Sequence, residues 1–362
     1  MNKLLLVFGT RPELIKLAPI VQEFRKRGLR ERLFIVFTHQ HPDIHISDLD
    51  LFKIDIDYQF HLDRENDSLT LLHGLLLIQF AHLKKHLKSK GVHAVALIAQ
   101  GDTCTTFSAS QFAFYEKIPL IHIEAGLRTG DYNEPFPEEY FRFSISQIAS
   151  IHCAPNQNSQ QQLIREGYQE DSIYVTGNTA IDNLRMFALG GGDVDFEKRN
   201  TVLVTLHRRE NVNGRLAMFI NRITDYAKRH PHKKFLWIDN PGYKLKDKIP
   251  ANISNLEVIP PLSYREMIHL YKRTELIITD SGGIQEESTF LQIPTLIFRQ
   301  KTEREESIVQ GIAKYWDQND DDLEQVIRSL SANKKSAQNY VFGDGFAAIR
   351  IVDAILEKGL IQ

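Results

Sequence analysis

Cysteine and long apolar runs are both scarce in this 362-residue chain. Cys104 and Cys153 are the only two thiols, too few for the disulfide framework of a small secreted protein, so we expect a reducing compartment and a cytoplasmic protein. The longest apolar candidate, Leu69–Leu83, is interrupted by polar residues. It falls short of the about 18 apolar residues that a membrane span requires. We therefore expect no membrane segment.

Neither positive nor negative side chains are in large excess. The chain has 44 Lys and Arg against 46 Asp and Glu, a net charge of -2, which gives no field suited to nucleic acid or to an anionic membrane. No GxxxxGK is present, which excludes a P-loop, and no GxGxxG follows a strand, which disfavours the usual dinucleotide site. His39 and His41 have no third ligand at metal spacing. We expect no metal, no other cofactor and no nucleic-acid partner.

What the chain does contain is an alternation of short apolar runs and helical patterns, which predicts an α/β fold with parallel sheets and right-handed crossovers. A Gly-rich stretch within 177–195 interrupts the alternation, which then restarts. We expect two Rossmann-like domains, residues 1–170 and residues 171–345. Residues 346–362 are expected to contain a last helix. The expected strands are Lys3–Phe8, Leu33–Thr38, Ala94–Ala99, Pro119–Ile123, Ile151–Ala154, Ile173–Val175, Val202–Thr205, Lys234–Ile238, Leu256–Ile259, Leu276–Thr279 and Pro294–Phe298.

The segment Pro119–Arg142 brings several carboxylates to the end of a buried strand. Glu124 follows the strand directly, and Glu138 and Glu139 lie in the first turn of the helix that Pro137 is expected to open. Pairing of Glu124 with Arg128 is one explanation, but an acid at a buried strand end favours a functional role. For Glu139 the simpler explanation, complementing the helix dipole, is favoured.

Two further strand ends in the first half carry polar groups. Asp102 follows Ala94–Ala99 and is either a helix cap or a site residue. Arg11 lies in the turn after Lys3–Phe8, with Lys16 one turn into the next helix. Two cations near a helix start suit an anion, although Lys16 could equally be a solvated side chain.

The second half has one strong candidate for a phosphate site. Asp280, Ser281, Gly282 and Gly283 follow a predicted strand and open a helix. Such a turn lets the backbone N–H groups of a helix start approach a phosphate. Glu287 lies one turn later, where an acid commonly binds ribose hydroxyls. A nucleoside diphosphate in this half and carboxylates in the other indicate nucleotide-sugar chemistry.

The motifs together resemble those of the non-hydrolysing UDP-N-acetylglucosamine 2-epimerases, nearly from end to end. The matching stretches are GTRPELIKLAP at 9–19, QGDT at 100–103, HIEAGLRTGDYNEPFPEEYFR at 122–142, VTGNTAIDNL at 175–184, HRRE at 207–210, DSGGIQEE at 280–287 and TERE at 302–305. The resemblance implies a glycosyltransferase-B-like fold with two domains facing a central cleft. It implies that residues 171–345 bind UDP and that the helix within 346–362 packs back on the first domain. It also implies a UDP-sugar substrate and a homodimer.

The resemblance implies residue roles that the residues alone do not fix. Its implied catalytic residues are Asp102, Glu124, Glu138 and His207. Its implied substrate-binding residues are Arg11, Lys16, Ser281, Gly282, Gly283, Glu287 and Arg304. Residues where the family binds a second, activating UDP-N-acetylglucosamine are Gln40, Arg64 and Arg209.

The chain departs from the family pattern at several positions. Pro42 and Asp43 follow Gln40–His41, Ile238 stands where the family has a histidine, Cys104 replaces a threonine and Glu305 replaces a proline. These changes affect the activator site and the identity of the sugar more than the nucleotide site. The expected function is reversible C2 epimerisation of UDP-N-acetylglucosamine, supplying N-acetylmannosamine units for cell-surface polysaccharide. The alternatives are an epimerase of the same family acting on a diacetamido uronic acid, a hydrolysing 2-epimerase, and a glycosyltransferase of the same fold or a nucleotide-sugar binding protein.

Overall fold

The computed structural model describes most of the chain, and the described residues form two compact units. The first comprises Met1–Asn183 and Phe342–Gln362, and the second comprises Leu184–Val341. Residues described are 1–41, 46–63, 68–188, 199–206, 215–239, 245–250, 253–299, 302–316, 323–332 and 340–361. None of the helices within these ranges is long and apolar enough to cross a membrane.

The first unit is built on a parallel sheet that has seven strands in the described part of the chain. Their spatial order is β3 (Tyr58–Gln59), β2 (Leu33–Phe37), β1 (Asn2–Phe8), β4 (His93–Gln100), β5 (Leu120–Ile123), β6 (Ala149–Ala154) and β7 (Ile173–Val175). Every residue of β2 is buried. Near-continuous apolar strands of this kind are typical of a parallel sheet that helices cover on both faces.

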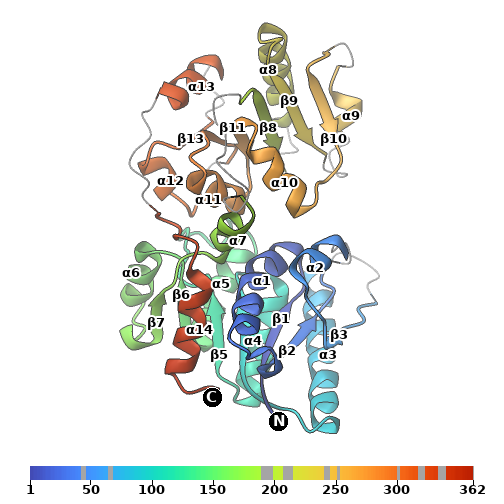
Figure 1. Ribbon diagram of the computed structural model, residues 1–362, viewed down its shortest axis with the longest axis vertical. Coiled ribbons are helices and arrows are strands. Elements are labelled where there is room, and N and C mark those ends of the chain that lie inside the picture. Colours follow the sequence, from blue (N-terminus) through green and yellow to red (C-terminus); the bar gives the residue numbers. More distant parts are fainter. Residues whose placement is uncertain are drawn as a thin grey trace. The chain divides into compact units, whose positions relative to one another are not determined.

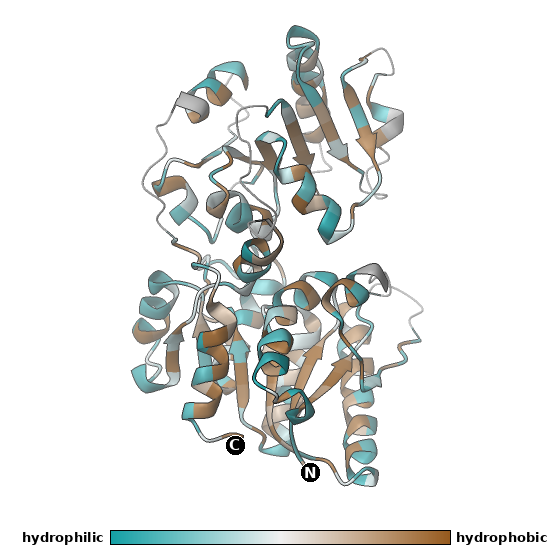
Figure 2. Ribbon diagram, in the orientation of Figure 1, coloured by the Kyte–Doolittle hydropathy of each residue, from teal (hydrophilic) through white to brown (hydrophobic). Residues whose placement is uncertain are grey.

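Helices cover this sheet because their apolar faces match the two faces of its strands (Figure 2). They are α1 (Arg11–Lys26), α2 (Ile46–Phe52), α3 (Leu69–Ser89), α4 (Cys104–Glu116), α5 (Glu138–Ile148), α6 (Gln157–Arg165) and α14 (Ala347–Glu357), with short 3-10 turns at Arg30–Arg32 and Glu170–Ser172. Leu5 and Val7 of β1 join one hydrophobic cluster with α3, α4 and α5. Leu4 and Leu6 point to the opposite face, because side chains alternate along a strand. Helices α1 and α14 pack side by side in this unit (Figure 1).

The second unit repeats the arrangement with a sheet of six parallel strands among the residues described there. Their spatial order is β10 (Leu256–Ile259), β9 (Lys234–Ile238), β8 (Thr201–Thr205), β11 (Thr274–Thr279), β12 (Thr295–Ile297) and β13 (Ala313–Tyr315). The helices are α8 (Arg215–Arg229), α9 (Leu245–Lys248), α10 (Tyr264–Tyr271), α11 (Gly282–Phe290), α12 (Glu306–Val309) and α13 (Leu323–Ala332). Helices α8 and α13 cover one face, where Phe219, Phe298 and Trp316 pack together. The two sheets confirm the expected α/β class with two Rossmann-like halves. Helix α7 (Thr179–Ala188), which the sequence reasoning did not anticipate, carries the chain from the first unit to the second.

Each sheet reverses its strand order once, and this locates a ligand site in each unit. The reversal falls between β1 and β4 in the first sheet and between β8 and β11 in the second. In open α/β sheets, ligands bind outside the carboxyl ends of the strands at such a switch point. The residues that follow these strands are Gly9–Arg11, Gly101–Thr103, Leu206 and Asp280–Gly282. The turns after β1, β4 and β11 that the sequence singled out therefore lie at the two switch points, while Glu124 follows β5, the strand next to β4.

Candidate active site

Glu124 lies at the carboxyl edge of the first sheet and is held by three donors. Its Oε2 is ion-paired with Nζ of Lys16, and it accepts hydrogen bonds from Gln100 Nε2 at 2.8 Å and Asn178 Nδ2 at 3.3 Å. Its φ of 68° is in the left-handed region, which a residue with a side chain rarely adopts. Such a conformation persists where the surroundings enforce it, commonly at a functional site. Lys16 is thus not a solvated side chain, and Glu124 is not paired with Arg128, whose guanidinium is bound to Glu166.

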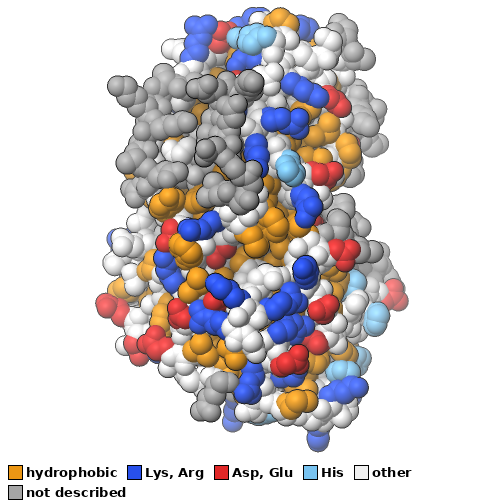
Figure 3. All heavy atoms as spheres, viewed as in Figure 1, with side chains coloured by type: hydrophobic (Ala, Val, Ile, Leu, Met, Phe, Trp, Pro, Cys, Tyr) orange, Lys and Arg blue, Asp and Glu red, His pale blue; other side chains and the backbone are white. Residues whose placement is uncertain are grey.

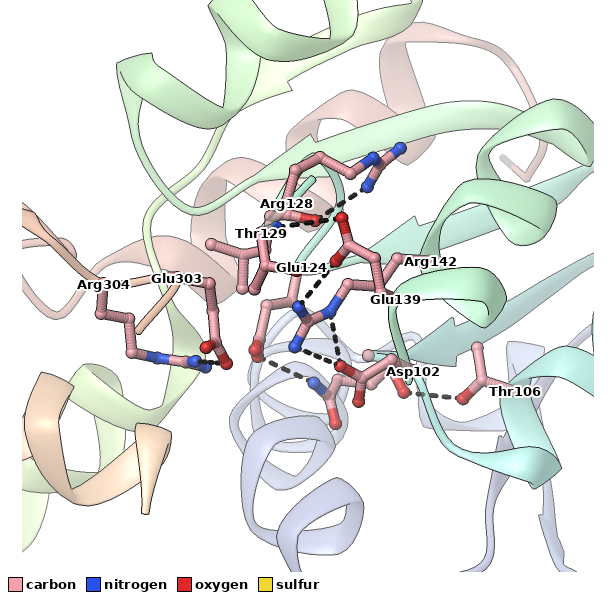
Figure 4. A network of polar contacts seen from close by, with 12 residues as sticks. Asp102, Thr106, Glu124, Arg128, Thr129, Glu139, Arg142, Glu303 and Arg304 are labelled. Atoms are coloured by element: carbon pink, nitrogen blue, oxygen red, sulfur yellow. Dashed lines mark hydrogen bonds and ion pairs between the residues drawn. The ribbon is translucent and has the colours of Figure 1, made fainter. Parts of the chain in front are cut away.

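Asp102 lies at the end of the neighbouring strand and is bound to Arg142 of α5. Nε and Nη2 of Arg142 both lie 2.6 Å from Oδ2 of Asp102. Nη1 of Arg142 lies 3.3 Å from Glu139, whose other oxygen accepts the N–H groups of Thr129 and Gly130 at 2.9 Å each. Figure 4 shows this chain of contacts from the end of β4 to the loop after β5. The network therefore connects Asp102, through Arg142 and Glu139, to the loop that follows Glu124.

Two simpler explanations offered from the sequence are wrong at these positions. Asp102 does not cap α4, because Thr103 takes that place and accepts the N–H of Thr106 at 3.1 Å. Glu139 does more than complement the dipole of α5, since it is buried and binds Arg142 and the loop backbone. Pro137 stands at the N-cap of α5, and Glu138 is the first helical residue, half-buried.

Glu13, which the sequence reasoning did not select, connects the two loops of the first switch point. It is fully buried, and its Oε2 accepts the N–H groups of Gly9 at 2.9 Å and Thr10 at 2.8 Å. Its Oε1 accepts the hydroxyls of Thr103 at 2.7 Å and Thr106 at 3.1 Å. Burial raises the pKa of Glu13, against these hydrogen bonds, which lower it. The Thr10–Glu13 capping-box spacing was a signal that could have identified it.

Arg11 and Gln40 are both engaged within the first unit. Nε of Arg11 lies 2.6 Å from Asp48 of α2, a fully buried carboxylate. Gln40 Oε1 accepts the N–H of Thr105 at 2.7 Å and its hydroxyl at 2.9 Å. Gln40 therefore connects the loop after β2 to the start of α4. Arg64, Pro42 and Asp43 lie outside the described residues.

The turn Ser281–Gly283 in the second unit is shaped by a buried arginine. A Cβ on Gly282 would collide with the Arg304 guanidinium, so a larger residue there would have to displace the arginine. Arg304 is ion-paired with Glu303 and with the fully buried Glu286, whose Oε1 lies 2.6 Å from Nε. A Cβ on Gly283 would meet no atom within 4 Å. Arg304 thus packs against Gly282 and supports the start of α11.

Glu287 of α11 is bound by two tyrosine hydroxyls of α10. The hydroxyl of Tyr271 donates at 2.6 Å and that of Tyr264 at 3.4 Å. The pKa of Tyr271 lies well above its usual value because the ring is buried and beside the carboxylate. His207 and Arg209 fall outside the described residues. No group of three or more acidic, histidine or cysteine side chains in the described ranges has the geometry to hold a metal ion.

Two buried histidines lie beneath the first site on neighbouring strands. His122 of β5 and His152 of β6 are register partners, and His122 Nε2 contacts the Gly101 carbonyl at 2.8 Å. Burial lowers the pKa of each histidine to about 4. Both rings are therefore neutral near pH 7, and His122 holds the backbone directly before Asp102.

Two polar strand ends in one unit and a phosphate-type turn in the other define a class of protein, the two-domain nucleotide-sugar enzymes. The same class of fold occurs in the glycotransferase of kitacinnamycin, which aligns with a TM-score of 0.58 at 12% identity. The family model described as UDP-N-acetylglucosamine 2-epimerase matches residues 23–356.

Individual relatives match over nearly the whole chain. The UDP-N-acetylglucosamine 2-epimerase of Salmonella borreze is 35% identical over 98% of both chains, and that of Bacillus subtilis is 32% identical over 98% of this chain and 95% of its own. The structure of the Neisseria meningitidis UDP-GlcNAc 2-epimerase bound to UDP-GlcNAc aligns with a TM-score of 0.85 at 31% identity, covering 98% of this chain and 100% of that one. The chain belongs to the UDP-N-acetylglucosamine 2-epimerase family. This confirms the family, the fold class and the isomerase class expected from the motifs.

Proposed function

We propose that this protein interconverts UDP-N-acetylglucosamine and UDP-N-acetylmannosamine by inverting the sugar at C2. One observation carries the proposal: two carboxylates, Asp102 after β4 at the switch point and Glu124 after the neighbouring strand β5, are each held by a cation. Inversion at C2 requires a group that removes a proton on one face and a group that returns one on the other. Family membership supports the same reaction.

The proposed chemistry is elimination followed by re-addition, and it balances without an oxidant. A carboxylate takes the C2 proton, the C2–H electron pair forms the C1=C2 bond, and the C1–O bond breaks as UDP leaves with its electron pair. A UDP oxygen then adds to C1 while a proton is delivered to the opposite face of C2. We assign the proton transfers to Asp102, Glu124 and Glu138, with His207 beside the diphosphate.

The remaining assigned residues bind the substrate. Arg11 and Lys16 act on the diphosphate and sugar, while Ser281, Gly282 and Gly283 offer backbone N–H groups at the start of α11 to phosphate. Glu287 binds the ribose. Arg304 acts by holding the turn, since its guanidinium is buried between Glu286 and Glu303.

The test is incubation with UDP-N-acetylglucosamine in heavy water, with C2 followed by NMR. Deuterium is expected at C2 of both epimers, with UDP still attached to most of the product. Stoichiometric release of free sugar from the start would instead identify a hydrolysing enzyme. Absence of any C2 exchange would leave a transferase or a binding protein.

Two further proposals concern the setting of the reaction. The product would supply N-acetylmannosamine units for cell-surface polysaccharide.

The protein would act as a homodimer, and exposed aromatic side chains of the first unit offer apolar surface for a second copy. They include Phe114, Tyr115, Phe136 and Tyr140. On the face drawn in Figure 3, Lys and Arg side chains lie among Asp and Glu side chains. Light scattering after size exclusion should give twice the mass of the chain, and a monomeric mass at working concentration would contradict the dimer.

A further inference from the structure

Asn178 lies where the chain is about to leave the first unit, and its groups hold three different segments. Its backbone N–H donates to the Phe342 carbonyl at 2.7 Å, on the segment that returns to the unit. Its Oδ1 accepts the N–H of Ala180 at 2.9 Å, which fixes the start of α7. Its Nδ2 donates to Oε2 of Glu124 at 3.3 Å. The residue is 3% exposed, so contacts within the protein define its position.

The departing and returning segments are locked together around Asn178. Gly177 and Gly343 have φ of +90° and +118°, and a Cβ on Gly177 would lie 3.1 Å from the Gly343 Cα. Asp182 of α7 accepts the N–H groups of Ala347 at 3.1 Å and Ala348 at 2.9 Å, capping α14. The two segments approach so closely that only glycine fits the contact.

Helix α7 is also bonded to α1, the helix that carries Lys16. Pro19 in α1 has no N–H, so the Ile15 carbonyl lacks its ordinary partner four residues on. Asn183 Nδ2 donates to that carbonyl at 2.6 Å. Asn183 therefore gives α7 a second attachment to the first unit, one that does not touch Glu124.

We propose that Asn178 is a positioning residue for Glu124, which it couples to the paired segments where the chain leaves and re-enters the first unit. This inference rests on the proposed function, because it assigns Glu124 a proton-transfer role. Two further donors to Glu124, Lys16 from α1 and Gln100 from β4, belong to the body of the unit. Asn178 instead lies on the departing segment, which is bonded to the returning segment at Phe342. A shift of the departing and returning segments therefore moves one of the groups that hold the Glu124 carboxylate in place.

The test replaces the donor and leaves the rest of Asn178 intact. Asn178→Asp keeps the size, the oxygen that accepts from Ala180 and the backbone N–H, but it turns an oxygen toward Glu124. The expected result is a fall of about tenfold to a hundredfold in C2 deuterium exchange, the range of a misplaced acid–base group. The KM and the affinity for UDP should stay close to those of the unaltered protein. Exchange is compared per folded molecule, because a buried carboxylate facing Glu124 also costs stability. Asn178→Ala removes the donor without adding charge and should slow exchange in the same direction.

Asn183→Ala is the matched control, an asparagine of the same segment whose loss leaves the Ile15 carbonyl unpaired. It should lower the melting temperature and leave the exchange rate per folded molecule within about twofold, because a lost buried hydrogen bond costs stability rather than chemistry. Wild-type exchange in both Asn178 variants would overturn the inference. So would a loss of exchange in Asn183→Ala as large as that in Asn178→Asp. If the unaltered protein itself shows no exchange, the proposed function fails, and the inference with it.

Discussion

Arg142 binds Asp102 through one carboxylate oxygen only. Nε and Nη2 of the guanidinium both lie 2.6 Å from Oδ2, and no described residue donates a hydrogen bond to Oδ1. The Asp102 side chain is 26% exposed, while that of Arg142 is 7% exposed. The arginine thus holds the carboxylate from the buried side through one oxygen. In the proposed reaction, the other oxygen would be the one that exchanges a proton with the sugar.

The first prediction concerns the two strand-end carboxylates. Asp102→Asn and Glu124→Gln keep the size and remove the charge, so each should lower turnover by at least ~10²-fold, as expected for a lost acid–base group. UDP affinity, measured by calorimetry, should change little, because the groups assigned to the nucleotide belong mainly to the second unit. Near-wild-type turnover in both variants would contradict the assignment.

The second prediction separates a positioning arginine from a structural one. Arg142→Lys cannot place two N–H groups on one oxygen, so turnover should fall about tenfold or more as Asp102 loses its orientation. Arg128→Lys is the control, because Arg128 makes a comparable two-point contact with Glu166 at 2.9 and 2.8 Å. It should lower stability by about 1–3 kcal/mol and leave turnover per folded molecule unchanged. Steady-state kinetics and thermal melts distinguish the two effects, and equal turnover in both variants would contradict the role of Arg142.

The third prediction compares two adjacent glycines. Gly282→Ala should displace Arg304, because the new methyl group meets the guanidinium, and it should weaken both stability and UDP binding. Gly283→Ala meets no protein atom within 4 Å and should leave stability unchanged or slightly higher, since Ala favours a helix. If phosphate approaches the backbone here, Gly283→Ala should still weaken UDP binding. Unaltered UDP affinity in both variants would argue against a phosphate site at this turn.

The fourth prediction concerns pH and the buried histidines. Burial lowers the pKa of His152 to about 4 in the native state, against its usual value of 6.5. Between these values the unfolded state binds a proton that the native state does not, so stability is complete above pH 6.5 and is lost as the pH falls toward 4. The loss is on the order of 3 kcal/mol for such a shift. His152→Phe, which cannot titrate, should therefore show a smaller drop in melting temperature between pH 7.5 and pH 5 than the unaltered protein. Equal drops would mean that His152 does not contribute.

The fifth prediction concerns activation by a second substrate molecule. Asp43 adds a carboxylate shortly after Gln40, a residue of the expected activator site. Ile238 stands where the family has a histidine, so a ring that could donate a hydrogen bond is absent. A like charge near a diphosphate weakens binding, so we expect activation by UDP-N-acetylglucosamine to be weak or absent. The reverse reaction, started from UDP-N-acetylmannosamine alone, should show its full early velocity. A long lag that a trace of UDP-N-acetylglucosamine abolishes would contradict this.

The sequence by itself determined the class of fold and the location of the two candidate sites. Buried strands such as β2 are continuous apolar runs, and the polar residues after them mark the carboxyl edge of a parallel sheet. Glu124 and the Asp280–Ser281 turn were identifiable because each directly follows such a run. Local patterns of this kind depend on near neighbours in the chain, which are visible in the sequence.

Only the tertiary structure decided which groups hold the carboxylates. Arg142 reaches Asp102 across 40 positions, Lys16 reaches Glu124 across 108 positions, and Asn178 reaches it across 54. No local pattern encodes these pairings, because they arise when the sheet brings distant strand ends to one edge. The partner of a charge is set by packing, and Glu124 pairing with Lys16 in place of the nearby Arg128 shows that sequence proximity does not determine it.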